Sequence, residues 1–340
     1  MNVADLAELL GLPDLPASLA TVEAALDAAV DRQPPNPHLV NPARRVVQGG
    51  GKRLRPVLAI AAAASCGTDL TRDVIAGAVA VELVHVGSLV HDDIIDNSAE
   101  RRGVPTVNAQ EGDAAAILVG DFLLAQAGEQ AASVSREVAS ALAMTIASLC
   151  DGQSRETQDL FNAHRSVDDS MASIGGKTAA LLQSSCRIGA LAARHSDAHV
   201  AALADFGHAF GMAFQIIDDV LDVVSTAELM GKPVGNDIRQ GVYTLPLLVA
   251  MESDGGDAVR RRLVDRGRGA LDDEAIEEIV SWIRASGAIG ESLATARHYN
   301  ESAARSLSIL EPGPVVEGLS RLPDAYLQWA LDAKAGAPIA

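Results

Sequence analysis

Two groups of aspartates with the same spacing stand out in this sequence. Asp92, Asp93 and Asp96 form an Asp-Asp-x-x-Asp group, and a second such group begins at Asp218. On a helix, the first and last carboxylates of each group share a face, where their like charges need a counter-charge. Carboxylate oxygens suit Mg²⁺, which proteins hold with one or two carboxylates together with substrate phosphates and water. The two groups therefore predict a site for several divalent cations and a phosphorylated substrate.

The second group consists of Asp218, Asp219 and Asp222, and it follows the apolar segment 214–217. Two solvated helix ends are the alternative interpretation of these groups. Both groups lie in largely apolar segments, however, which favours a metal site. A calcium loop of the EF-hand type is excluded, because the alternating Asp and Asn ligands and the central Gly are missing.

Basic residues beside glycines or beside an aspartate group form a complementary set. Lys52 and Arg55 follow three glycines and open a predicted helix, whose N-terminus favours anions. Arg101 and Arg102 come just after the first aspartate group and suit bidentate binding of a diphosphate. Two further lysines each follow a glycine, namely Lys177 and Lys232.

Neither Gly-Lys segment fits a nucleotide-binding P-loop. The segment 176–178 would require a glycine where Met171 stands, and Lys52 is followed by Arg53 rather than by Ser or Thr. Neither segment follows a convincing strand, so a P-loop is excluded.

One histidine lies in the apolar segment before the first aspartate group. His85 precedes Asp92 by two helical turns, on roughly the same face. It is either a core residue or a contact for a diphosphate.

The segment before Asp92 must be a long helix if it is to position these groups. Thr71 predicts its N-cap, and no proline occurs until Pro105, so a helix is predicted over about 71–97. Apolar residues recur three and four positions apart along nearly all of the chain, which predicts an all-α fold. A helix is predicted after the glycines 49–51, running to about Cys66. Further helices are predicted at about 113–133, 135–163, 168–193, 197–225, 244–252, 272–286 and 289–310, with loops at 101–105 and 255–269.

Composition limits the class of protein. The chain has 340 residues, of which 48% are hydrophobic and 3% aromatic, and its net charge is -18 at pH 7. It is globular, and its core must consist mainly of Ala, Leu, Val and Ile. The acidic balance argues against a general nucleic-acid binder. No linker is long enough to separate domains, so residues 1–340 are predicted to form a single domain.

Cellular location is predicted from what the sequence lacks. The first fifteen residues have no basic region of the kind that signal peptides carry, and no apolar run reaches the length of a membrane span. The cysteines are three, widely spaced and without a Cys-x-x-Cys pair. We therefore expect a cytoplasmic protein.

Taken together, these motifs resemble the trans-polyprenyl diphosphate synthase family, of the bacterial long-chain type. The resemblance covers about residues 40–250, with the motifs in the order that the family has. It implies an all-α, single-domain bundle of about a dozen helices around a deep central cavity, usually a homodimer. It rests on the two aspartate groups and on the segments 50–56, 101–103, 120–121, 177–178 and 214–215.

The resemblance also implies a role for each motif. Three Mg²⁺ would be held by Asp92, Asp93, Asp96, Asp218, Asp219 and Asp222. The allylic diphosphate would be held by Arg101, Lys177, Thr178, Gln215 and Lys232. Isopentenyl diphosphate would be held by Lys52, Arg55, His85 and Arg102. The catalytic residues would be Asp92, Asp93, Asp96, Asp218, Asp219, Lys177 and Arg101.

Two further expectations follow from the resemblance. The family often has a lysine in a Gly-Lys-x-Thr segment where this chain has Val242, so one diphosphate contact is in doubt. The chain-length positions before the first aspartate group, Gly87, Ser88 and, deeper, Val84, lack the bulky residues that stop growth early. We expect a product of thirty carbons or more, for a quinone side chain, released through transient membrane contact. A geranylgeranyl product is the alternative.

Three other classes of protein fit this sequence less well. A terpene cyclase usually has one aspartate triad and many aromatics, and head-to-head synthases lack the Gly-Gly-Lys-Arg segment. A non-catalytic subunit of a heteromeric synthase typically loses one aspartate motif, and this chain keeps both. The prediction is therefore a prenyl transferase.

Overall fold

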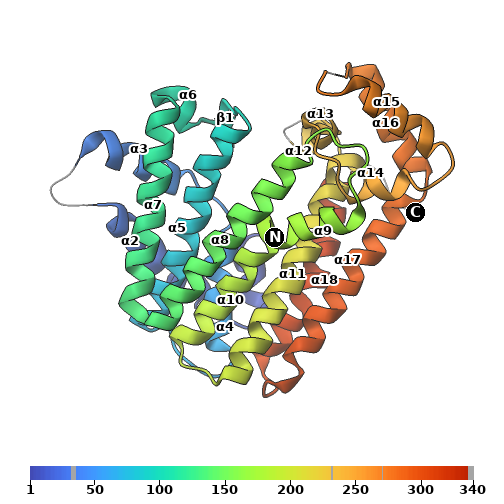
Figure 1. Ribbon diagram of the computed structural model, residues 1–340. Coiled ribbons are helices and arrows are strands. Elements are labelled where there is room, and N and C mark those ends of the chain that lie inside the picture. The colour runs from blue at the N-terminus through green and yellow to red at the C-terminus, as the bar shows by residue number, and fades with distance from the viewer. Residues whose placement is uncertain (32–35, 231–232, 270, 336–340) are drawn as a thin grey trace. The chain divides into compact units, whose positions relative to one another are not determined.

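The computed structural model describes residues 1–31, 36–230, 233–269 and 271–335. These residues are almost entirely helical (Figure 1). The exception is one two-stranded antiparallel ribbon, formed by β1 (Glu100–Arg101) and β2 (Val104–Pro105). The predicted all-α fold is therefore confirmed.

The chain divides into two compact units, and the single domain over residues 1–340 stays a prediction. Unit 1 comprises Met1–Ile146, Leu181–Gly207 and Leu307–Leu319. Unit 2 comprises Ala147–Ala180, His208–Ser306 and Ser320–Ala340. Most of the boundaries fall inside helices or at their ends, so no change in composition marks them in the sequence.

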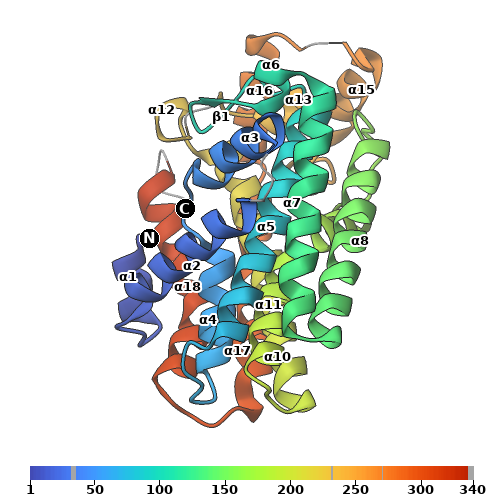
Figure 2. The same cartoon turned by 90° about the vertical axis from the view of Figure 1, so that its left-hand side faces the viewer.

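Unit 1 is built around helix α5 (Arg72–Ile95), which is buried along most of its length. Thr71 is its N-cap and accepts a hydrogen bond from the backbone N–H of Val74, as predicted. Helix α7 (Asp113–Val134) runs beside α5 in both views (Figures 1 and 2). The other helices before α7 are α1 (Val3–Leu9), α2 (Leu15–Val30), α3 (Pro37–Gln48), α4 (Leu54–Ala64) and α6 (Val107–Glu111).

Unit 2 has an apolar core to which α11 (Asp197–Val224) contributes its second half, from Met212 onward. Helices α14 (Leu245–Ala250), α16 (Asp273–Ala285) and α17 (Ala288–Ser306) pack on this core. The remaining elements that lie wholly or partly in unit 2 are α8 (Arg136–Gln158), α9 (Val167–Ile174), η1 (Gly175–Ala179), α10 (Ala180–Ala192), α12 (Ala227–Met230), α13 (Asn236–Gln240), α15 (Gly256–Arg266) and α18 (Pro314–Lys334). A short 3₁₀ turn, η2 (Leu307–Ile309), belongs to unit 1.

Several predicted elements differ from the structure. The helix predicted over 168–193 is interrupted by the π-helical turn η1, where the backbone hydrogen bonds change from the i→i+4 to the i→i+5 pattern. The predicted loop at 101–105 pairs with itself as the β1–β2 ribbon. The glycine-rich segment 255–269 contains α15, whose N-terminus follows Gly255 in the left-handed conformation. Helix α18 was not predicted.

Two helices, α5 and α11, are long and apolar enough to span a membrane by length and composition alone. In each of them, 72% of the most apolar window is buried inside the protein. This degree of burial is that of core helices, which meet the same length and composition criteria.

Candidate active site

The first aspartate group lies at the C-terminal end of α5, in unit 1. The backbone N–H of Asp96 donates to the carbonyl of Asp92 at 2.8 Å, so these residues are one helical turn apart and their side chains share a face. Asp93 is buried, and its Oδ1 accepts a hydrogen bond from Nε of Arg101 at 2.8 Å. Burial raises the pKa of the Asp93 carboxyl, and the Arg101 guanidinium acts in the opposite sense. Asp93 therefore holds Arg101, one of the predicted diphosphate ligands.

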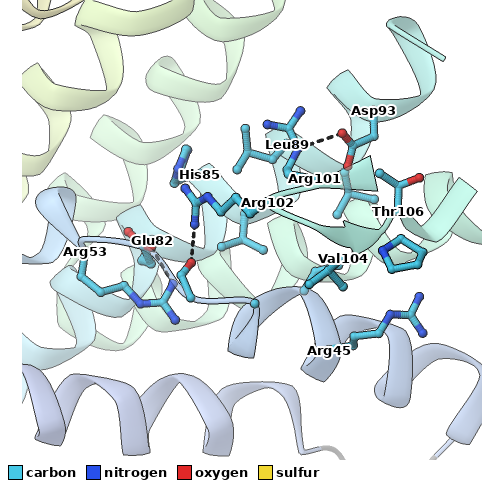
Figure 3. Close-up of a pocket in the computed structure, with 16 residues that line it drawn as sticks. Arg45, Arg53, Glu82, His85, Leu89, Asp93, Arg101, Arg102, Val104 and Thr106 are labelled. Atoms are coloured by element: carbon cyan, nitrogen blue, oxygen red, sulfur yellow. Dashed lines mark hydrogen bonds and ion pairs between the residues drawn. The ribbon is translucent and has the colours of Figure 1, made fainter. Parts of the chain in front are cut away.

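A pocket lies next to this group, between α3, α5 and the β1–β2 ribbon (Figure 3). His85, Arg101 and Arg102 line it, as the prediction of a diphosphate site requires. Its volume of about 60 Å³ has room for several waters or a small anion. Glu82 and Asp93 are acidic residues in the same wall. The first aspartate group and three of the predicted diphosphate ligands therefore meet in unit 1.

Arg102 is fixed to the glycine segment that precedes α4. Its Nη1 donates to the carbonyl of Gly50, a contact visible in Figure 3. Gly51 has a φ of 143°, and a Cβ built on it would lie 2.7 Å from Nη1 of Arg102. Glycine is required there, because any side chain would displace the guanidinium that lines the pocket.

The other two predicted ligands of isopentenyl diphosphate, Arg55 and Lys52, are not among the residues that line this pocket. Arg55 lies near His85 and Arg102, and its Nε makes no hydrogen bond within the part of the chain that the structure describes. Burial lowers the pKa of the Arg55 guanidinium, the charge of Arg102 lowers it further, and the charge of Glu82 acts in the opposite sense. Lys52 is exposed in the loop before α4 and is not part of the pocket wall.

His85 is neutral in this environment. Burial lowers the pKa of His85 well below its ordinary value, and the guanidinium groups of Arg55 and Arg102 lower it further. Arg101 and Arg53 contribute in the same direction. A neutral imidazole can donate one hydrogen bond to a diphosphate without adding charge to the pocket.

The lowered pKa of His85 predicts acid sensitivity. Below about pH 6.5 the unfolded chain takes up a proton at this residue and the folded chain does not. The free energy of unfolding therefore decreases as the pH is lowered through this range. Above that pH the effect is absent. The groups that face His85 are the four arginines and Glu82. Thermal unfolding between pH 5 and 8 should show a shallower loss of Tm in His85→Gln than in the parent, and equal slopes would contradict the prediction.

The second aspartate group lies on α11, in unit 2. Asp219 is 4% exposed, and its Oδ1 accepts a hydrogen bond from Nε2 of Gln215 at 2.9 Å. The Oε1 of Gln215 accepts in turn from the hydroxyl of Thr178 at 2.7 Å. Burial raises the pKa of Asp219 well above its ordinary value, and the charges of Asp237 and Asp218 raise it further. Thr178, Gln215 and Asp219, which the sequence predicts as site residues, are thus joined in one chain of hydrogen bonds.

The turn η1 positions Lys177, whose Nζ lies 2.5 Å from Oε1 of Glu156 on α8. A Cβ on Gly176 would lie 2.7 Å from Cα of Gly152, so two glycines allow the helices to touch at this point. Sequence reasoning missed Glu156. The contact between Gly152 and Gly176 cannot be deduced from one sequence. The only sequence signal for Glu156 is its position one helical turn after Gly152.

Asp222 is held by the backbone of the segment that follows α11. It is 3% exposed, and its Oδ2 accepts a hydrogen bond from the backbone N–H of Asp237 at 3.1 Å. Its own carbonyl accepts from Gly235. Asp222 therefore fixes the start of α13, and its place among the metal ligands remains a prediction. Lys232 lies outside the described residues.

The donor set fits a divalent cation that is bound together with a substrate. Within the described residues, no three His, Cys, Asp or Glu side chains converge closely enough to hold a metal ion by themselves. Asp92 and Asp96 provide two hard oxygen donors on one face of α5. Two carboxylates are the usual protein share for Mg²⁺ when phosphates and water complete its coordination.

Comparison with known proteins agrees with this geometry. A family model described as polyprenyl synthetase matches residues 36–283. The heptaprenyl diphosphate synthase component 2 of Geobacillus stearothermophilus is 38% identical over 91% of this chain and 94% of its own length. The nonaprenyl diphosphate synthase of Mycobacterium tuberculosis is 35% identical over 81% and 82%.

A solved structure gives the same result. The polyprenyl synthase of Caulobacter crescentus, crystallised with calcium and isoprenyl diphosphate, superposes with a TM-score of 0.86. It is 30% identical, and the match covers 95% of this chain and 97% of that one. The family uses a divalent metal, which agrees with the carboxylates found here. The chain therefore belongs to the polyprenyl synthetase family and is a prenyl transferase.

Proposed function

We propose that this protein elongates an allylic diphosphate with isopentenyl diphosphate in the presence of Mg²⁺. The observation that carries the proposal is the pocket in unit 1, where His85, Arg101 and Arg102 lie beside the first aspartate group. Cationic donors next to carboxylates form the arrangement that a metal-bound diphosphate requires. A nucleotide site of the P-loop type is excluded, because neither Gly-Lys segment fits its pattern.

The residues of each unit contribute separately to this reaction. In unit 1, Arg102 and His85 would bind the diphosphate of isopentenyl diphosphate, and Asp92 with Asp96 would hold metal. In unit 2, Asp218 would hold metal, and Lys177 would bind the allylic diphosphate. When bound, Mg²⁺ would neutralise charge that develops on the leaving diphosphate and so favour cleavage of the allylic C–O bond. Three ions per site are part of the proposal.

The metal dependence gives a direct test of the proposed reaction. Treatment with EDTA should abolish elongation, because without metal the charge on the leaving diphosphate is not neutralised. Added Mg²⁺ should restore elongation. Incorporation of labelled isopentenyl diphosphate into an extractable product measures this. Unchanged elongation after complete removal of metal would overturn the proposal.

The proposed product has thirty carbons or more. Two relatives carry names of hepta- and nonaprenyl synthases, and this agrees with the small residues that precede the first aspartate group. A geranylgeranyl product is the alternative. A long prenyl chain would suit a quinone side chain and would leave for a membrane by transient contact.

The chain-length prediction can be tested at Ser88 rather than at Gly87. A Cβ on Gly87 would lie 3.3 Å from both the carbonyl oxygen of Gly120 and Cβ of Leu123, so Phe at this position would push α5 away from α7. Ser88 is only partly buried, and its hydroxyl donates to the carbonyl of His85. Val84 is fully buried. Ser88→Phe should shorten the product, as measured by chromatography of the dephosphorylated prenols.

An unchanged product length in a folded and active Ser88→Phe variant would contradict the assignment of this face to the product path. Ser88→Ala is the control, because it removes the hydroxyl without adding volume. We expect the product length of Ser88→Ala to equal that of the parent.

We propose that the active form is a homodimer in the cytoplasm. One relative is named as component 2 of a heptaprenyl synthase, which favours a second, different chain as the other candidate partner. Light scattering of the purified chain, together with its activity alone, distinguishes the two. An inactive pure chain that gains activity on addition of a second protein would support the heteromeric form.

A further inference from the structure

Arg53 lies at the centre of a buried ionic cluster in unit 1. It is 7% exposed and has a φ of 48°, a left-handed conformation that few residues other than glycine adopt. Its guanidinium contacts three helices: Nε lies 2.5 Å from Glu23 on α2, Nη2 donates to the carbonyl of Val47 on α3 at 2.6 Å, and Nη1 donates to Glu82 on α5 at 2.8 Å. Figure 3 shows Arg53 and Glu82 facing each other.

The position of Arg53 in the sequence gives this cluster its significance. Arg53 is preceded by Lys52 and followed after one residue by Arg55, and both neighbours are predicted diphosphate ligands. Gly50, whose carbonyl binds Arg102, lies three residues before it. The contacts of one side chain therefore fix the backbone of the whole segment that carries these groups.

Glu82 is the buried acid of the cluster. It is 3% exposed and lies one helical turn before His85, in the wall of the same pocket. Its Oε1 accepts from Arg53, while its Oε2 is buried and has no hydrogen-bond partner within the described part of the chain. The charge of Glu82 also acts on Arg55, whose pKa it raises against the effect of burial. A buried carboxylate in this position compensates two arginines.

We propose that Glu82 and Arg53 are positioning residues that hold the Gly50–Arg55 segment against α5, and that they thereby shape the pocket for the diphosphate of isopentenyl diphosphate. The inference rests on the proposed function for the identity of that ligand. Neither residue is assigned contact with the reacting atoms. Glu82 acts through Arg53 and Arg55, and Arg53 acts through the backbone of the segment.

Two physical effects give opposite expectations for Glu82→Gln, which makes the variant informative. A glutamine keeps a hydrogen-bond acceptor for Arg53 but removes the negative charge. If Glu82 acted only as a charge in the pocket, its removal would strengthen the binding of an anion. If Glu82 positions the arginines, its removal weakens that binding, because Arg53 loses its buried counter-ion.

We expect Glu82→Gln to raise KM for isopentenyl diphosphate about tenfold, the size of the loss when one charge-assisted hydrogen bond is weakened. KM for the allylic substrate should stay within about twofold. The double variant Arg53→Met/Glu82→Met replaces the pair by apolar side chains, which buried pairs often tolerate without loss of stability. It should fold and still show the raised KM, so the test holds even where Glu82→Gln does not fold.

Asp31→Asn is the matched control. It breaks the exposed ion pair between Asp31 and Arg44 of α3, 3.2 Å apart, and should leave both KM values unchanged. An unchanged or lowered KM for isopentenyl diphosphate in folded Glu82→Gln or in the folded double variant would overturn the inference.

Binding of inorganic diphosphate without metal, measured by calorimetry, separates this inference from the proposed function. Weaker binding in the two Glu82 variants than in the parent supports the positioning role, even if the parent shows no elongation. Equal or tighter binding overturns the positioning role, even if the parent elongates normally.

Discussion

Replacing Asp92 or Asp218 by asparagine is expected to lower kcat by at least about 10²–10³-fold, the size of effect seen when one group that stabilises transition-state charge is removed. Each residue belongs to an Asp-Asp-x-x-Asp group, one in unit 1 and one in unit 2. An amide keeps the size of the side chain but removes the charge that a hard divalent cation requires. Steady-state elongation at saturating substrates measures the effect, and raised Mg²⁺ should recover part of the loss.

A control for the change of charge is available in the same chain. Asp257 lies on the exposed surface of α15, 3.5 Å from Arg260. Asp257→Asn should leave kcat within about twofold, because exposed ion pairs contribute little. Equal kcat in Asp92→Asn, Asp218→Asn and the parent would refute the metal-binding role of the two groups.

Replacing Lys177 by methionine should lower kcat by about 10²-fold or more and raise KM for the allylic diphosphate. The variant removes the cation that η1 presents and leaves Glu156, 2.5 Å away in the parent, without this partner. Lys177→Arg should recover part of the activity, since it restores the charge with a different geometry. The kinetic constants for the allylic substrate and for isopentenyl diphosphate are measured separately.

The change in KM should be larger for the allylic diphosphate than for isopentenyl diphosphate, and this difference identifies the role of Lys177. Lys177 lies in unit 2, and the pocket assigned to isopentenyl diphosphate lies in unit 1. A larger rise in KM for isopentenyl diphosphate than for the allylic substrate would therefore contradict the assignment of Lys177. Similar Tm values for the parent and both variants would show that the loss is not one of folding.

The parts of the site that the sequence predicts well are those within one helix or one short segment. Thr71 as N-cap and the face shared by Asp92 and Asp96 follow from helical geometry alone, and both are found. His85, which the sequence places two turns before the first aspartate group, lines the same pocket as Asp93 of that group.

The parts that the sequence could not predict depend on contacts between distant segments. Arg53 stands between the predicted ligands Lys52 and Arg55 in the sequence, but its burial against Glu82 is a property of packing. Asp222 has the same spacing in its group as Asp96, yet Asp222 is buried and bonds to the backbone at Asp237, while Asp96 is exposed. An identical motif thus has different surroundings at its last residue, and local sequence carries no signal of that difference.

The central claim is tested most directly by incubating the pure protein with labelled isopentenyl diphosphate, one allylic starter at a time, and Mg²⁺, then sizing the products. Repeated addition of five-carbon units to an allylic diphosphate, ending at thirty carbons or more, is the predicted result. Failure of the correctly folded chain to extend any starter, alone or as a dimer, would contradict the account.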